Sequence, residues 1–362
     1  MYAYLPTPAV VIELAQMEEN IRKMTEAAAG YQIKVRPHIK PHKSVEIARL
    51  QLRMGCSGIT CAKLGEAEVM AKGGIDDILI AFPLIGQEKM QRLKILSRKA
   101  RVITIVNSEE GARQLSETFQ NSPDKIEVLI EVDGGINRGG KKPYEPTLEF
   151  ARQIAGLPGI DIKGILYYGG TIYGEKDREG FEKTSARERE EMLGTARMLE
   201  NAGFHMEILS GGNSYSSKMP WLLEGITEIR PGHYLFNDVG QLMSGFAKEQ
   251  ECALRVTASV VSIVDERHAI IDAGSKTLTT DICARKEGYG YVVGRPDITI
   301  SKLNEEHGFI ESEGRLGLEI GDKIAVIPNH ACVVPNLADE VYGIRNGKLD
   351  HLIRIDARGK NR

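Results

Sequence analysis

From residue 33 to about residue 236, short β-branched segments alternate with longer amphipathic segments. Strand, helix, strand with short connections predicts parallel βαβ units. About eight such units in roughly 200 residues are the size of a (β/α)8 TIM-like barrel. An open doubly wound sheet is the alternative, and it is less favoured because no Gly-x-Gly-x-x-Gly opens the first helix. The expected strands are Ile33–Ile39, Gly58–Ala62, Asp77–Ala81, Val102–Val106, Ile126–Val132, Ile162–Tyr168, Met206–Leu209 and Tyr234–Phe236.

The pattern changes at about Gly245, where closely spaced strand-like runs follow one another with little helix between them. Such runs predict a second, all-β domain. The early strand Ala9–Glu13 precedes the barrel pattern and is expected to join this domain. The predicted fold class is therefore α/β, with a barrel over residues 14–244 and a β-strand domain built from residues 1–13 and 245–362. The expected strands after the barrel are Leu254–Val264, His268–Asp272, Tyr289–Val293, Asp297–Ser301, Lys323–Ile327 and Leu352–Ile355.

Composition excludes several classes of partner. A net charge of −3 over 362 residues gives no case for nucleic acid or an anionic membrane. No apolar run approaches the roughly 20 residues needed to span a bilayer. The first residues lack a basic segment followed by an apolar one, so nothing indicates export. Five scattered cysteines, an odd number, indicate a reducing compartment, and we expect a cytoplasmic protein.

The basic stretch from Arg36 to Lys43, Arg-Pro-His-Ile-Lys-Pro-His-Lys, follows an apolar segment expected to be a buried strand. In a barrel, reactive groups sit at the C-terminal ends of strands. Cationic neighbours and partial burial lower the pKa of an amine, which is what a Schiff-base lysine requires. The stretch therefore makes Lys40 a candidate catalytic lysine, whereas a basic surface loop is the simpler alternative.

Further polar groups follow later strands of the predicted barrel. Arg138 comes after the fifth strand, Tyr168 ends the sixth, and the turn Ser210–Ser214 follows the seventh. The segment that begins at Arg230 leads into the eighth. Barrels commonly bind phosphate in the loops after strands seven and eight, where glycine-rich turns let backbone N–H groups converge on an anion. A lysine together with a phosphate site suggests pyridoxal 5′-phosphate.

The motifs resemble those of the fold-type III pyridoxal-phosphate enzymes, which have the alanine-racemase-like barrel. Within this group the chain most resembles the D-threonine aldolase / D-serine dehydratase family. The resemblance is carried by Arg-Pro-His-x-Lys-x-His-Lys, Val-Asp-x-Gly-x-x-Arg-x-Gly, Arg-Pro-Gly-x-Tyr and a late His-x-Cys, in the family's order. Pro41, the segment from Tyr167 to Tyr173, and Val334 depart from the family's common pattern, which leaves the choice of substrate open.

The resemblance implies a role for each matching position. Lys40 would carry the cofactor and exchange the Cα proton, with His42 in a supporting catalytic part. Arg138 would approach the phenolic oxygen, and Tyr168 the ring face. Arg230 would contact the pyridine nitrogen, although a salt bridge with Glu228 is the alternative. The remaining cofactor-binding positions are Gly212, Asn213, Ser214, Gly232 and His233, which would line the phosphate, and Tyr234.

The pair His330 and Cys332 occupies the position of the family's metal ligands. Alternate residues of a strand share one face, so both side chains could reach one ion. Imidazole with thiolate suits zinc, and two protein ligands would leave positions open for water and substrate. The expected cofactors are therefore pyridoxal 5′-phosphate and a divalent metal, zinc or manganese. Simple packing is the alternative for the pair.

The implied function is a lyase acting on small β-hydroxy-D-amino acids. A D-threonine aldolase would release glycine and an aldehyde; the alternative, a D-serine dehydratase, would release pyruvate and ammonia. An amino-acid racemase is less favoured because residues 254–282 contain no tyrosine to act as a second base, although Tyr289 and Tyr291 lie just beyond. A non-catalytic cofactor-homeostasis protein is less favoured because such proteins resemble the barrel alone. By analogy with fold-type III enzymes we expect a head-to-tail homodimer.

Overall fold

A computed structural model describes residue 2 and residues 4–362. The chain forms two compact units. The barrel unit consists of residues 23–40, 47–232 and 359–362, and the β unit consists of residues 1–22, 41–46 and 233–358. The domain limits expected from the sequence, 14–244 and 1–13 with 245–362, remain a prediction. No helix in the described part of the chain combines the length and apolar character needed to cross a membrane.

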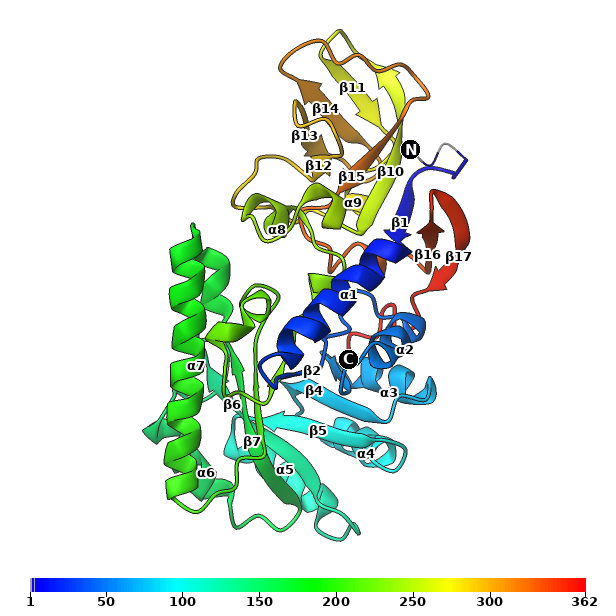
Figure 1. The fold of residues 1–362 in the computed structure, drawn as a ribbon. Helices are drawn as coiled ribbons and strands as arrows, with labels where there is room; N and C mark the ends of the chain where they lie inside the picture. Colours follow the sequence, from blue (N-terminus) through cyan, green and yellow to red (C-terminus); the bar gives the residue numbers. More distant parts are fainter. Residues whose placement is uncertain (1, 3) are drawn as a thin grey trace. The chain divides into compact units, whose positions relative to one another are not determined.

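The barrel unit contains one eight-stranded parallel sheet with the order β2-β9-β8-β7-β6-β5-β4-β3 (Figure 1). Residues just after β2 close it on the other side: the N–H of Ile39 donates to the carbonyl of Thr60 at 2.9 Å, and the N–H of Thr60 donates to Pro37 at 2.8 Å. The predicted fold class is thus confirmed. The strands are β2 (Lys34–Val35), β3 (Ile59–Cys61), β4 (Asp77–Pro83), β5 (Arg101–Val106), β6 (Ile126–Asp133), β7 (Ile160–Tyr168), β8 (Ile208–Gly211) and β9 (Glu228–Ile229).

Helices connect successive strands of the barrel unit, as the alternating pattern predicts. Side chains from five neighbouring strands, β4 to β8, among them Leu79, Ile103, Leu129 and Leu166, form a buried cluster in this sheet. Helix ends carry local caps: the side chain of Asp177 accepts from the N–H of Gly180 at 2.9 Å. The helices are α2 (Val45–Arg53), α3 (Leu64–Lys72), α4 (Gln87–Leu96), α5 (Glu109–Phe119), α6 (Glu145–Ile154) and α7 (Arg178–Asn201), and α1 (Leu14–Ala29) begins in the β unit.

The expected eighth strand, Tyr234–Phe236, is wrong. The eighth strand is β9, which pairs with β2 and β8, and residues His233–Leu235 form a short 3-10 helix instead. Pro231 has no N–H to donate, and Gly232 has little preference for extended backbone, so the strand ends before them. The correction places Arg230 at the C-terminal end of a strand rather than before one.

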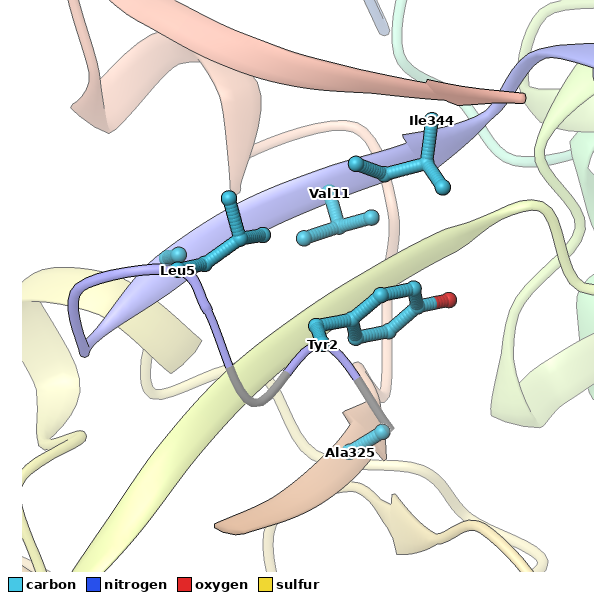
Figure 2. Close-up of a cluster of buried hydrophobic side chains, with 6 residues drawn as sticks. Tyr2, Leu5, Val11, Ala325 and Ile344 are labelled. Carbon is cyan, nitrogen blue, oxygen red and sulfur yellow. The ribbon is translucent and has the colours of Figure 1, made fainter. Parts of the chain in front are cut away.

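The β unit is built on a mixed sheet in which β1 (Ala9–Glu13) pairs with β10 and β16. The expected recruitment of the early strand Ala9–Glu13 is confirmed. Its inner face packs in a cluster of Tyr2, Leu5, Val11, Ala325 and Ile344 (Figure 2). The other elements are α8 (Val239–Met243), α9 (Ser275–Leu278), β10 (Leu254–Ile263), β11 (His268–Ile271), β12 (Tyr291–Val292), β13 (Ile298–Leu303), β14 (Gly308–Ser312), β15 (Lys323–Ile327), β16 (Glu340–Arg345) and β17 (Lys348–Arg354).

Candidate active site

Lys40 follows the segment that closes the barrel sheet. Residues 37–39 are fixed by hydrogen bonds to Thr60, and the backbone N–H of Lys40 donates to Nδ1 of His38 at 3.3 Å. The Lys40 side chain is exposed, so the partial burial expected from the sequence is wrong. The strand thus presents a solvent-accessible amine at the C-terminal end of β2, which is the reactive end of a barrel.

His42 belongs to the β unit, where it is fully buried. Its Nδ1 accepts from the N–H of Ser44 at 3.1 Å, so this nitrogen carries no proton when the bond is made. The neighbouring Lys43 is buried, and its carbonyl accepts from the N–H of Ala357 at 2.9 Å. These bonds anchor the end of the basic stretch to the C-terminal part of the β unit.

The turn after β8 is held in one conformation by its own side chains. Gly212 has φ +71°, and an added Cβ would lie 2.6 Å from Cγ2 of Ile229. Oδ1 of Asn213 accepts from the N–H groups of Tyr215 and Ser216 at 2.9 and 3.1 Å. The turn therefore requires glycine at position 212, and Asn213 fixes its shape from within.

Glu188, a residue of α7 that the sequence pattern did not single out, lies beneath this turn. Its Oε1 accepts from the N–H of Gly212 at 2.7 Å, and burial raises its pKa. The N–H of Asn213 donates to Ser216 Oγ at 3.1 Å. Two of the amides expected to face a phosphate are thus bound within the chain.

Ser214 is the best-placed anion donor in this turn. Its Oγ accepts from the N–H of Gly232 at 3.1 Å, which leaves its hydroxyl proton to donate elsewhere. Its backbone N–H has no hydrogen-bond partner among residues 2 and 4–362. Ser214 is nevertheless only 2 % exposed. A buried N–H and O–H side by side fit the role of a small anion site.

Arg230 occupies the centre of a buried network at the ends of β7, β8 and β9. Its guanidinium donates to Ser210 Oγ at 2.8 Å and to the carbonyl of Tyr167 at 2.8 Å. Burial lowers the pKa of Arg230 to about 10, against the opposing charge of Glu228. At neutral pH the group therefore remains a cation.

Glu228 does not bond Arg230 directly. Its Oε1 accepts from the Ser210 hydroxyl at 2.6 Å, and its Oε2 accepts from Nε of Arg36 at 2.8 Å. Arg36 in turn pairs with Asp77. The salt bridge considered from the sequence is thus made by Arg36, and Arg230 is joined to it through the Ser210 hydroxyl.

Arg138 and Tyr168 lie together after β6 and at the end of β7. The guanidinium carbon of Arg138 is 4.1 Å from the centroid of the Tyr168 ring, which is the distance of a cation–π contact. Arg138 is exposed and Tyr168 is half-buried. Tyr234, expected at the cofactor, is fully buried in the β unit.

His233, His330 and Cys332 converge in the β unit. One ligand atom from each lies within 4.8 Å of the others. The sequence predicts that His330 and Cys332 share a strand, and this is wrong: both lie in the turn after β15. The strand ends there because Pro328 has no N–H to continue the ladder. His233, which the resemblance assigned to the phosphate, supplies a third potential ligand that no motif in the sequence indicates.

Asp238 supports these three side chains, called here the ligand trio. Its Oδ2 accepts from Nδ1 of His330 at 3.0 Å, which leaves Nε2 of that ring as the metal-binding atom. Burial raises the pKa of Asp238, but the charges of His233 and His330 outweigh this effect and lower the pKa to about 2. Asp238 is therefore ionised and orients the ring.

Charge is also shifted onto the trio itself. Burial raises the pKa of the Cys332 thiol, but the charge of His330 and the hydrogen bonds from both histidines lower it to about 5. The negative charge of Cys332 and the bond to Asp238 raise the pKa of His330 to about 11. A thiolate at neutral pH is the form that binds soft divalent metals.

Comparison with known proteins agrees with this arrangement. Residues 12–239 match the N-terminal domain of alanine racemase, and residues 253–344 match a putative serine dehydratase domain. The 3-hydroxy-D-aspartate aldolase of Paracoccus denitrificans (strain Pd 1222) is 31% identical, with 98% of this chain and 93% of that protein covered. The D-threonine aldolase of Arthrobacter sp is 31% identical, with 99% and 94% covered.

The chain belongs to the D-threonine aldolase / D-serine dehydratase family. The crystal structure of D-threonine aldolase from Filomicrobium marinum superposes on it with a TM-score of 0.92 at 29% identity, covering 100% of this chain and 98% of that one. A cysteine-to-alanine mutant of D-threo-3-hydroxyaspartate dehydratase, described as in the metal-free form, has a TM-score of 0.90 at 28% identity, covering 97% and 98%. The similarity to this dehydratase therefore extends over nearly the whole length of both chains.

Proposed function

We propose that the protein is a lyase that acts on β-hydroxy-D-amino acids, requires pyridoxal 5′-phosphate and a divalent metal, and cleaves its substrate as D-threonine aldolase does. One observation carries the proposal: a chain of this family places two imidazoles and a thiolate within 4.8 Å of one another. A substrate hydroxyl is the group that such a metal site would recognise in this family's chemistry.

The residues of the barrel unit fit the organic cofactor. Lys40 offers an accessible amine for the Schiff base, and Ser214 offers a buried N–H and O–H for the phosphate. Arg138, Tyr168 and Arg230 would contact the ring, and Gly212, Asn213 and Gly232 would shape the phosphate turn. When bound, this cofactor supplies an electron sink that stabilises negative charge at the Cα atom of an amino acid.

The ligand trio fits a divalent metal. Two nitrogen ligands and one sulfur ligand are a usual zinc set, and three protein ligands leave a coordination position open. A metal held there would lower the pKa of a bound hydroxyl. We propose zinc as the ion, with manganese as the alternative, because thiolate favours the softer metal.

The side chains of this chain would then move two protons. In the aldolase reaction, a base removes the proton of the β-hydroxyl, the Cα–Cβ bond breaks, and Cα receives a proton, which yields glycine and an aldehyde. In the dehydratase alternative, a base removes the Cα proton and hydroxide leaves from Cβ, which yields a keto acid and ammonia after hydrolysis. We assign Cα proton exchange to Lys40 and a supporting acid–base part to His42.

The remaining features are proposed by analogy. A head-to-tail homodimer follows the arrangement of fold-type III enzymes. A cytoplasmic location agrees with five cysteines that are all free thiols. Racemisation is less favoured because residues 254–282 contain no tyrosine for a second base. A non-catalytic cofactor-homeostasis protein is also less favoured, because such proteins resemble the barrel alone and this chain has a β unit with the ligand trio.

The function is tested by incubating the holoenzyme with D-threonine and D-serine, with and without a chelator, and measuring aldehyde and keto acid separately. We expect acetaldehyde and glycine from D-threonine and loss of this product on chelation. Pyruvate from D-serine alone would instead establish the dehydratase. Interconversion of D and L forms that is insensitive to the chelator would refute the lyase. Borohydride reduction followed by peptide mapping should label Lys40, and a label on another lysine would refute that assignment.

A further inference from the structure

Glu188 is a buried carboxylate of the barrel unit to which the proposed reaction gives no part. It lies on α7 and is 1 % exposed. Its Oε1 accepts from the N–H of Gly212 at 2.7 Å, and its carboxylate also accepts from the hydroxyl of Ser216. Solvent does not screen a carboxylate at this depth, so both its hydrogen bonds and its charge act strongly on the turn after β8.

The carboxylate of Glu188 also holds a second amide of this turn, through Ser216. The N–H of Asn213 donates to Ser216 Oγ at 3.1 Å, and the Ser216 hydroxyl donates in turn to Glu188. One carboxylate therefore fixes two consecutive amides, those of Gly212 and Asn213. For a phosphate, the turn as described offers the N–H and the hydroxyl of Ser214 instead.

Two glycines give this carboxylate its room. A Cβ at Gly211, the last residue of β8, would lie 3.2 Å from Oε1 of Glu188. A Cβ at Gly169, which directly follows β7, would lie 3.1 Å from Oε2. Both distances are shorter than an ordinary van der Waals contact, so the side chain fits only where these two positions lack a Cβ. Gly211 therefore serves Glu188 as well as the turn.

The charged and titratable groups around Glu188 come from three elements. Burial raises the pKa of Glu188, while its hydrogen bonds and the charges of Arg230 and Arg187 lower it. Tyr167 of β7 donates to Glu191 at 2.5 Å, and it stays neutral because burial raises its pKa. Two donors and two cations thus support a negative charge on Glu188, at the base of a turn that would bind a phosphate dianion.

We propose that Glu188 is a positioning residue of this turn and that its negative charge weakens the binding of the cofactor's 5′-phosphate there. The inference rests on the proposed pyridoxal-phosphate site and states how the chain tunes that site. The hydrogen bonds of Glu188 fix the shape of the turn, and its charge repels a second anion bound to the same turn. Glu188 thus sets how tightly the cofactor is held.

The test measures binding of pyridoxal 5′-phosphate to the full chain, freed of cofactor, by equilibrium dialysis. Glu188→Gln keeps an oxygen that can accept from Gly212 but removes the charge. We expect its dissociation constant for pyridoxal phosphate to fall by about tenfold or more, and that for pyridoxal, which has no phosphate, to stay unchanged. Glu190→Gln, exposed on the same helix, is the matched control and should bind both ligands as the wild type does. Unchanged or weaker binding of pyridoxal phosphate in Glu188→Gln overturns the inference.

The pH dependence separates charge from shape. Protonated Glu188 carries no charge, so the ratio of the wild-type dissociation constant to that of Glu188→Gln should be largest at high pH and should approach one as pH falls. Titration of the phosphate itself cancels in this ratio, because both proteins bind the same ligand. A ratio that does not vary with pH refutes the effect of the charge.

A second variant keeps the inference testable if Glu188→Gln does not fold. Glu188→Asp keeps the charge but is shorter, so it cannot reach Gly212 as Glu188 does. We expect it to bind pyridoxal phosphate several-fold more weakly than the wild type, and equal or tighter binding overturns the positioning role. If the wild type does not bind pyridoxal phosphate, the proposed function and this inference fail together. If it binds but Glu188→Gln leaves the affinity unchanged, only this inference fails.

Discussion

Asp238 holds His330 by its Nδ1 atom, at 3.0 Å from the carboxylate oxygen. The same oxygen accepts from the N–H of Ala331 at 3.2 Å, and the carboxylate is almost fully buried. A ring fixed in this way presents Nε2 in one orientation. Asp238 is therefore a positioning residue for the metal and does not need to touch it.

Replacement of the Asp238 carboxylate should lower the affinity for the metal but should not abolish binding. For Asp238→Asn we expect metal affinity to fall by about 10–100-fold, which is the usual effect of losing the carboxylate that orients a metal-binding histidine. Cys332→Ala should lose the metal altogether, and lyase activity with it. Competition with a chromogenic chelator measures both effects. Wild-type affinity in Asp238→Asn would contradict the orienting role.

The imidazole–thiolate pair should make the metal-free protein most stable between about pH 6.5 and pH 9. The folded Cys332 has a pKa of about 5, below its ordinary 9.0, so its contribution is lost as pH falls towards 5. The folded His330 has a pKa of about 11, above its ordinary 6.5, so its contribution is lost as pH rises towards 11. Between the two ordinary values the folded and unfolded pair bind equal numbers of protons, and the contribution is constant.

This profile is checked by thermal unfolding with chelator at a series of pH values, in the wild type and in Cys332→Ser. Serine keeps the size of the side chain but does not ionise in this range. In Cys332→Ser, the free energy of unfolding should not show the decrease towards pH 5 that the Cys332–His330 pair causes in the wild type. A Cys332→Ser profile parallel to that of the wild type would show that the pair does not control stability.

The buried ion pair Arg36–Glu228 should be costly to break from one side. Both side chains are about 5% exposed or less, so Glu228→Gln leaves a buried guanidinium with one fewer charged partner. We expect the free energy of unfolding to fall by about 3–5 kcal/mol, as for other buried pairs that lose one member. Chemical denaturation measures this loss.

Glu127→Gln provides the control, because its partner Arg101 is 41% exposed. There the loss should stay at or below about 1 kcal/mol. Equal losses in the two variants would show that burial does not set the strength of the Arg36–Glu228 pair.

The turn after β8 should tolerate no side chain at Gly212. Gly212→Ala must adopt φ +71° and bring Cβ to 2.6 Å from Ile229 and 2.8 Å from Ser217 Oγ. We expect a loss of about 1–3 kcal/mol in stability from backbone strain alone, with weaker binding of pyridoxal phosphate. Gly156→Ala, where nothing lies within 4 Å and φ is not positive, should leave both unchanged. Wild-type cofactor affinity in Gly212→Ala would argue against this turn as the phosphate site.

The barrel strands could be predicted from the sequence because each is a short β-branched run between helical segments. In the β unit, the strands Lys323–Ile327 and Ala9–Glu13 have the limits that the sequence predicts. The strand predicted at Tyr234–Phe236 is wrong because an apolar aromatic run after Pro231-Gly232 is compatible both with a strand and with a buried 3-10 turn. The two-residue strand Glu228–Ile229 is too short to give a periodic signal.

The site was predictable where a motif is local and less so where the fold brings distant residues together. Lys40 and the His330–Cys332 pair stand out in the sequence, but His233 lies about 100 positions earlier, and only the tertiary structure shows that it approaches them. Glu188 and Asp238 carried no signal, since a single carboxylate in a helix or at a helix start is common. The bond between Arg36 and Glu228 joins opposite ends of the barrel sequence, and periodicity cannot reveal such a pairing.

The chain of contacts from Arg36 through Glu228 and Ser210 to Arg230 has a consequence for recombination among related genes. A chimera whose crossover falls between residues 36 and 210 would inherit the two halves of this network from different parents. Hybrids that exchange these four positions together should yield folded protein far more often than hybrids that separate them.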